Sequence, residues 1–158
     1  MARSARDTAG LPSCRTAGGR TVYGGGGIYP DVVLPEAEPA PVWLARLTED
    51  AVQTRWIGAH LTENAAAYTT AEALAAAPRL PDAALVQFRA FAQQQGHSIP
   101  TGAEADRALQ RLLVPEIAGT KWGSAGYYRV LAALDEQIAV AVAEFERAAA
   151  ILGTRNRE

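Results

Sequence analysis

Residues 16–41, "TAGGRTVYGGGGIYPDVVLPEAEPAP", divide the chain into two parts of different character. Two short β-prone runs, 20–23 and 28–34, lie on either side of four consecutive glycines. Glycine costs roughly 0.5–1 kcal/mol relative to alanine inside a regular strand or helix, so we expect this run to mark backbone that bends, bulges or is closely approached. The pattern predicts a glycine-rich strand pair over residues 20–34. Pro30 lacks an amide donor and belongs at a sheet edge or at the start of a strand.

The segment after this pair, residues 35–41, has the sequence "PEAEPAP" and cannot continue a strand or a helix. It is typical of a linker, and the sequence beyond it has helical periodicity. We therefore expect residues 1–19 to be a disordered or loop leader, and residues 42–153 to be helical. The predicted fold class is mainly α: a short N-terminal glycine-rich β-strand pair followed by a bundle of about five helices.

Apolar spacing and capping residues give the expected helix boundaries. A first amphipathic helix is expected from about 41 to 62, and the next two begin at Thr69 and Pro81. The pairs Thr69 with Glu72 and Thr101 with Glu104 have the spacing of capping boxes, and Gly96 offers a left-handed helix stop.

The C-terminal third is expected to contain a helix with a kink at Pro115 and then a corner around Trp122. Beyond the corner, Asp135 is a candidate N-cap for a final helix that ends at Gly153. An apolar stripe follows at intervals of four and three residues: Ile138, Val142, Phe145, Ala149 and Leu152.

The composition excludes several classes of protein. A chain of 158 residues with 49% hydrophobic and 20% charged residues is typical of one globular domain, and no apolar run approaches the ~20 residues of a membrane span. Residues 1–20 carry four arginines and one aspartate, whereas the remainder carries eleven basic and sixteen acidic residues. This acidic body argues against nucleic acid as a partner.

The sequence contains few signals for export or for disulfide formation. Cys14 is the single cysteine, so an intrachain disulfide is impossible. The N-terminus "MARSARDTAG" contains no apolar stretch of signal-peptide length, and we expect no export signal.

Two patterns in the sequence could support catalysis or ligand binding, and each also has a structural explanation. Lys121 and Ser124 could form a nucleophilic pair, but the neighbouring glycines favour a turn with a solvated lysine. The glycine run lacks the lysine of a phosphate-binding loop, because Ile28 and Tyr29 follow it. We therefore expect no catalytic residue and no cofactor.

Metal binding was weighed in the same way. His60 and Glu63 could supply two metal ligands from one helical face, but His97 and Cys14 are not placed to complete a site. No metal site is therefore expected.

The remaining polar and aromatic residues favour structural roles. Glu144 and Glu146 are interpreted as the solvated face of the last helix. The aromatic residues are interpreted as core or helix-interface residues rather than a base-stacking platform: Trp43, Trp56, Phe88, Phe91, Tyr127, Tyr128 and Phe145.

The stretch "RTAGGRTVYGGGGIYPDVVL", residues 15–34, resembles the segment that follows the catalytic region in C-terminal processing peptidases, the tail-specific serine proteases of bacteria. The family has a glycine-arginine pair, a glycine-rich bend, an Ile-x-Pro-Asp motif and a hydrophobic strand. The matching residues are Gly19, Arg20, Gly24, Gly25, Gly26, Gly27, Ile28, Pro30, Asp31 and Val32. The downstream segment from Lys121 to Leu152 is similar to the helical C-terminal extension of some bacterial members.

This resemblance implies a parent enzyme with a serine nucleophile, a lysine base and a PDZ domain, located in the periplasm or cell envelope. Those parts normally precede the matched stretch, and the single lysine, Lys121, lies far from the expected position of the base. The chain alone is therefore predicted to be inactive and to act as a scaffold, with the upstream peptidase fragment or another protein chain as its partner. The alternative is a free-standing helical protein-interaction module. Neither interpretation fixes the oligomeric state.

Overall fold

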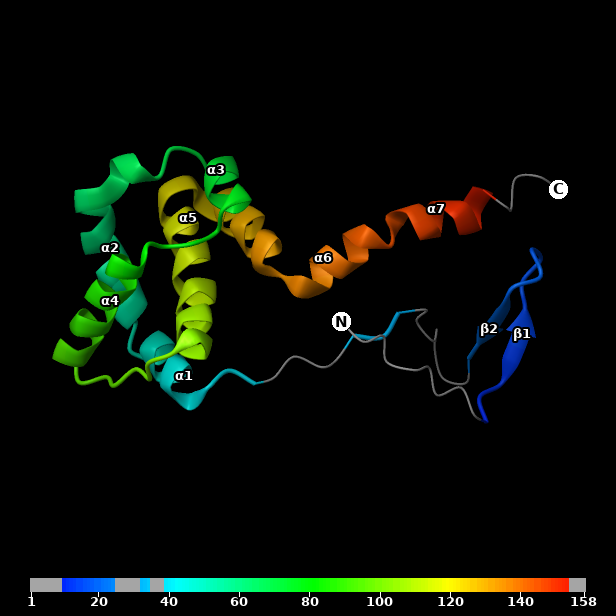
Figure 1. Cartoon of the computed structure of the whole chain (residues 1–158), viewed down its shortest axis with the longest axis horizontal. Helices are drawn as coiled ribbons and strands as arrows, with labels where there is room; N and C mark the ends of the chain where they lie inside the picture. Colours follow the sequence, from blue (N-terminus) through cyan, green and yellow to red (C-terminus); the bar gives the residue numbers. More distant parts are fainter. Residues whose placement is uncertain (1–9, 25–31, 35–38, 154–158) are drawn as a thin grey trace. The chain divides into compact units, whose positions relative to one another are not determined.

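The computed structural model describes residues 10–24, 32–34 and 39–153. The chain is mainly helical and has a short antiparallel two-stranded sheet near its N-terminus, which confirms the predicted fold class (Figure 1). It divides into two units, residues 1–38 together with 140–158, and residues 39–139.

The sheet is a hairpin of β1 (Ser13–Arg15) and β2 (Thr21–Tyr23), in which Cys14 lies opposite Val22. The loop between the strands is closed by two backbone hydrogen bonds, from the Thr16 amide to the Arg20 carbonyl and from the Gly19 amide to the Thr16 carbonyl, both at 2.9 Å. Gly19 has φ +75°, a left-handed conformation that favours glycine. The hairpin therefore turns at Gly19.

The strand pairing differs from the prediction. We expected 20–23 to pair with 28–34 across the four glycines, but its partner is β1, inside the 1–19 segment that we expected to be loop. Residues 32–34 are not in a strand, and residues 25–31 lie outside the described residues. The physical reason is that Gly19 already supplies a left-handed turn residue in a loop closed by two hydrogen bonds, whereas ordering four consecutive glycines costs more backbone entropy.

Residues 39–139 form a helical unit whose core lies between its helices. Its elements are α1 (Val42–Glu49), α2 (Val52–Asn64), the 3-10 turn η1 (Ala65–Ala67), α3 (Ala71–Ala76), α4 (Asp82–Gln94) and α5 (Ala103–Leu134). Helices α2 and α3 pack on α5, and α1 and α4 pack on α2 (Figure 1). The fully buried side chains include Leu47, Val52, Leu80, Phe88, Leu109, Ile117 and Val130.

The expected helix from 41 to 62 is split in two at Asp50 and Ala51. Ala51 has a left-handed conformation, φ 51° and ψ 33°, which ends α1 before α2 begins. The Arg55 guanidinium donates a hydrogen bond of 2.8 Å to the Asp50 carbonyl, an acceptor that the end of α1 leaves without a helical partner. This break allows both Leu47 and Val52 to reach the core.

Both predicted capping boxes are wrong, because the capping residue lies one position later. Thr70, not Thr69, caps α3 by accepting a hydrogen bond of 3.1 Å from the Ala73 amide. Glu72 is consequently one residue too early to bond back to the cap, and it pairs with Arg129 at 3.1 Å instead. Gly102 occupies the N-cap of α5 and makes no side-chain bond.

Helix α4 confirms the prediction for this segment. It begins after Pro81 with Asp82 in its first turn, buries Phe88 and Ala92, and is followed by Gly96 at φ +86°. A left-handed glycine directly after a helix is a common stop signal.

Helix α5 continues through the buried Pro115 and is interrupted at Gly123 instead. Gly123 has φ 70° and ψ −167°, so the corner predicted near Trp122 is present at the next residue. The backbone dihedrals at Pro115 remain helical, so the helix does not end there. Proline removes one amide donor, but the surrounding packing retains the helix.

Two helices follow α5: α6 (Glu136–Ala143) and α7 (Phe145–Gly153). The side chain of Asp135 accepts hydrogen bonds from the amides of Gln137 at 2.8 Å and Ile138 at 3.2 Å, which confirms it as the N-cap of α6. The single final helix that we expected is interrupted at Glu144.

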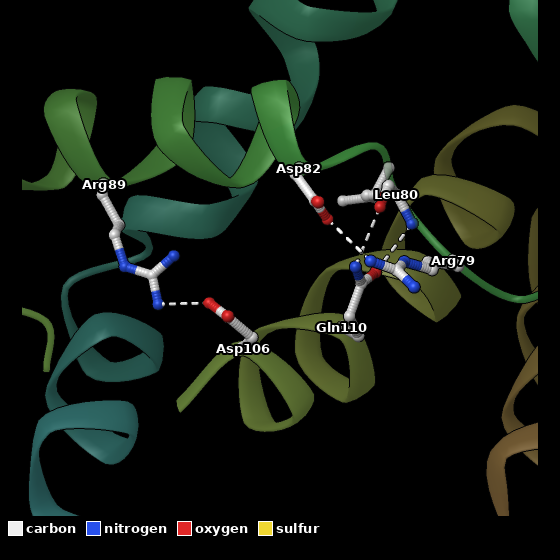
Figure 2. Close-up of polar contacts among 6 residues, drawn as sticks. All are labelled: Arg79, Leu80, Asp82, Arg89, Asp106 and Gln110. Atoms are coloured by element: carbon white, nitrogen blue, oxygen red, sulfur yellow. Dashed lines mark hydrogen bonds and ion pairs between the residues drawn. The ribbon is translucent and has the colours of Figure 1, made fainter. Parts of the chain in front are cut away.

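Polar side chains link the elements of the helical unit (Figure 2). The Gln110 amide of α5 accepts from the Leu80 amide at 2.7 Å and donates to the Leu80 carbonyl at 2.9 Å. Arg89 of α4 pairs with Asp106 of α5 at 2.7 Å. None of the helices in the described ranges is long and apolar enough to cross a membrane.

Candidate functional site

The helical unit has an open depression of about 380 Å³ beside α3. Its wall comes from the C-terminal end of α2, the turn 65–70, α3 and the first two turns of α4. The lining residues are His60, Asn64, Ala67, Tyr68, Thr69, Thr70, Ala73, Leu74, Ala77, Arg79, Pro81, Ala83, Ala84 and Gln87. Small alanine side chains on α3 and α4 leave this space, and polar and apolar side chains share the wall.

The polar part of the wall is centred on His60, which is 8% exposed. Its imidazole stacks on the Trp56 indole with 4.5 Å between ring centroids. Its Nε2 lies 2.8 Å from the Tyr68 hydroxyl, and its Nδ1 lies 3.4 Å from Asn64 Nδ2. Three side chains from α2 and the following turn therefore form one hydrogen-bonded group, in which His60 and Tyr68 are buried and Asn64 is half-buried.

The hydrogen-bond pattern assigns the protons of this group. Asn64 Nδ2 donates to the His60 carbonyl at 3.0 Å, so the amide nitrogen also faces Nδ1, which must accept. A neutral imidazole has one donor nitrogen and one acceptor, and Nε2–H therefore donates to the Tyr68 oxygen. The hydrogen of the Tyr68 hydroxyl is left without an acceptor among the described residues.

Burial acts on both titratable members of the group. Desolvation lowers the pKa of His60 below its usual 6.5, and the nearby Glu63 carboxylate opposes this shift more weakly. Burial also raises the pKa of the Tyr68 hydroxyl above its usual 10.0. Both shifts favour neutral side chains, and the pair acts as a hydrogen-bonding group near neutral pH.

Lys121 and Ser124 are not joined by a hydrogen bond among the described residues. The Lys121 amine donates to the Ala65 carbonyl and lies 5.5 Å from the centre of the Trp122 ring. Ser124 is exposed, directly after the kink at Gly123. In place of the solvated lysine that we expected, Lys121 is half-buried and links α5 to η1.

The histidine residues weighed as metal ligands are held by other partners. His60 is bonded to Tyr68, and His97 Nε2 lies 3.2 Å from a carboxylate oxygen of Asp50. Cys14 is exposed on β1. Within the described ranges, no group of three or more His, Cys, Asp and Glu side chains could hold a metal ion.

The aromatic residues divide into three groups. Trp43, Phe91 and Tyr127 are half-buried, and the first two pack against the core. Trp56 and Phe88 are buried and pack edge to face with 5.2 Å between centroids, as predicted for core residues. Tyr128 and Phe145 are 66% and 67% exposed, so the expectation that they are core or helix-interface residues is wrong. The predicted apolar stripe that includes Phe145 is divided by the interruption at Glu144, and α6 buries none of its residues.

The motif behind the resemblance is described only in part. Gly19 and Arg20 belong to the hairpin loop, and the Gly24 amide donates to the Pro12 carbonyl at 2.9 Å. Val32 is described and half-buried, and the remaining residues of the motif lie outside the described residues: Gly25, Gly26, Gly27, Ile28, Pro30 and Asp31. Comparison of the chain with protein-family models, curated proteins and solved structures found no match. The resemblance therefore remains a prediction.

Sequence reasoning missed Tyr68 and Asn64. Asn64 is four residues after His60, a spacing that places both on one helical face, and this was the available signal. Tyr68 lies beyond the end of α2, in a turn whose path back toward His60 has no periodic signature.

Proposed function

We propose that this chain is a non-catalytic scaffold, the C-terminal part of a tail-specific serine peptidase whose nucleophile and base belong to other residues of the parent enzyme. The proposal rests on the resemblance of residues 15–34 and on one structural observation. The side chains best suited to act as bases already have structural partners: Lys121 has the Ala65 carbonyl, His60 has Tyr68, and His97 has Asp50. A general base must be within reach of the proton that it removes.

The experiment compares the chain alone with the chain co-expressed with the proposed upstream peptidase segment. The DNA upstream is read in all frames for a PDZ-like region and a serine-lysine peptidase core, and that segment is co-expressed with residues 1–158. Cleavage of an unstructured peptide is then measured. We expect no turnover by the chain alone and turnover by the combined polypeptides.

Two results would contradict this proposal. One is turnover by the purified chain that disappears in both Lys121→Ala and Ser124→Ala. The other is an upstream region that encodes no peptidase core.

A second function, a free-standing protein-interaction module, is favoured by exposed apolar side chains on α6 and α7. Val142 is 56% exposed, and Phe145 is exposed to a similar extent. These two exposed apolar side chains are three residues apart in the sequence, and a contiguous exposed apolar surface is typical of protein-binding sites. The double variant Val142→Ser/Phe145→Ser should lower the retention of binding partners in a pull-down, with Val86→Ser, another exposed valine, as the control.

A further inference from the structure

We propose that the depression beside α3 binds a small monocarboxylate, with the Tyr68 hydroxyl and the Arg79 guanidinium as donors to the carboxylate and the alanine-rich wall in contact with an aliphatic tail. This site does not depend on the proposed scaffold role. All of its lining residues lie in the helical unit 39–139, and none lies in the stretch 15–34 that resembles the peptidases.

The first argument is an unused donor in a buried residue. Tyr68 is only 8% exposed, and its oxygen accepts from His60 Nε2 in the tautomer assigned above. Its own hydrogen then needs an acceptor, since an unsatisfied buried donor costs about 1–3 kcal/mol. Tyr68 lines the depression, where an acceptor atom of a ligand can reach it.

The second argument is the charge of the wall. Arg79 is the one charged side chain among the described lining residues. It uses one donor on Asp82, at 2.7 Å, and a guanidinium has five (Figure 2). Asp82 neutralises part of its charge but is not itself a lining residue. The wall thus offers donors to an oxygen anion, and no lining carboxylate repels it.

The third argument is size and apolar character. A volume of about 380 Å³ is at the small end of the range of ligand pockets. The apolar wall includes Ala67, Ala73, Ala77, Ala83 and Leu74. These side chains suit a short aliphatic group, whereas a larger ligand would project into solvent.

The test uses the full chain labelled with ¹⁵N and titrated with butyrate, with n-butylamine as a probe of similar size and opposite charge. We expect butyrate to give saturable shifts of the amide signals of Thr69, Thr70 and Ala73, and n-butylamine to give none. Tyr68→Phe removes only the hydroxyl and should weaken butyrate binding at least about five-fold. Tyr128→Phe changes an exposed tyrosine outside the depression and should leave binding unchanged.

A second variant tests the cavity without altering its polar group. Ala73→Leu fills part of the depression and retains the amide that Thr70 caps, so it should abolish the butyrate shifts while the spectrum remains that of a folded protein. Absence of saturable shifts with butyrate, equal affinity of the wild type and Tyr68→Phe, or equal binding of n-butylamine would each overturn the proposal.

Discussion

His60 lies between the rings of Trp56 and Tyr68 and uses both ring nitrogens in hydrogen bonds within the fold. Protonation would place a second N–H, on Nδ1, against the Asn64 amide hydrogens, so the charged form loses an interaction as well as hydration. At the residue scale, this group therefore connects folding to pH.

The first prediction concerns acid sensitivity. Burial lowers the pKa of His60 in the folded state below 6.5. Above pH 6.5 the imidazole is neutral in both the folded and the unfolded protein, so its titration does not change the free energy of unfolding. As the pH falls below 6.5, the unfolded chain takes up the proton first, and stability decreases until the pH reaches the lowered folded pKa. The thermal unfolding midpoint should therefore be lower at pH 5.5 than at pH 7.5.

His60→Gln should reduce this difference between the two pH values. The matched control is His97→Gln, which replaces the other histidine and retains His60, so the loss at pH 5.5 should persist. An unchanged pH response in His60→Gln would show that other groups cause it.

The second prediction concerns Gln110, whose side-chain amide bonds to both backbone groups of the buried Leu80. Gln110→Ala removes both partners at once, and each unsatisfied backbone group is expensive. We expect a loss of about 1–3 kcal/mol in the free energy of unfolding, measured by urea denaturation. Gln93→Ala, an exposed position on α4, should change it by less than about 0.5 kcal/mol, and equal effects of the two variants would contradict the proposed clamp.

At the scale of the element, two glycines that both lie within helices differ in the atoms that an added methyl group would contact. A Cβ at Gly126 would lie 2.8 Å from Trp122 Cβ and 2.9 Å from the Ala118 carbonyl oxygen, whereas a Cβ at Gly58 meets nothing within 4 Å. Backbone and Cβ atoms cannot move aside without shifting the helix. The close approach around Gly126 therefore depends on the absence of a side chain.

The third prediction follows from this difference. Gly126→Ala should destabilise the protein by about 1–3 kcal/mol through overpacking. Gly58→Ala should be neutral or stabilise it by up to about 1 kcal/mol, because alanine is the better helix former. Urea denaturation of both variants checks the sign, and a stable Gly126→Ala protein would mean that the helix after Gly123 adjusts freely.

The fourth prediction concerns the break between α1 and α2. Ala51 has φ 51°, a left-handed conformation that costs a residue with a side chain about 1–2 kcal/mol. Glycine adopts this conformation without that cost but loses more entropy on folding, so Ala51→Gly should stabilise the protein by up to about 1 kcal/mol. Ala45→Gly, within α1, should destabilise it by about 1 kcal/mol. Destabilisation by Ala51→Gly would contradict the assigned strain.

The elements differ in how far sequence alone predicts them. Apolar spacing and Gly96 were sufficient to predict α4, because the signal is local. The predicted N-caps Thr69 and Thr101 were misplaced by one residue. Each is followed by another residue that can cap a helix, so the sequence offers two equally acceptable N-cap positions. The break at Ala51 has no local signal, because alanine favours helix, and the buried residues Leu47 and Val52 lie on either side of the break.

At the scale of the whole molecule, the candidate site was the least predictable part. The residues His60 and Asn64 share a helical face by spacing, but the contact with Tyr68 depends on the path of the turn that follows α2. The depression itself depends on how α3 and α4 are placed, and such tertiary packing has no period in the sequence. The hairpin was predicted as a class but with the wrong partner strand, because four consecutive glycines are a stronger turn signal in the sequence than Gly18 and Gly19.

The last prediction concerns where the folding energy resides. Every buried hydrophobic side chain among the described residues lies between Leu47 and Val130, inside the unit 39–139. Burial of apolar area is the main favourable contribution to folding, so residues 39–139 expressed alone should fold cooperatively. Circular dichroism should give a helical spectrum and a thermal midpoint within a few degrees of that of the full chain.

Residues 39–109 are the matched control. This fragment ends before Gln110 and lacks most of α5, and it should not fold, because the helix on which α2 and α3 pack is absent. A non-cooperative transition in 39–139 would mean that residues outside this unit contribute essential stability.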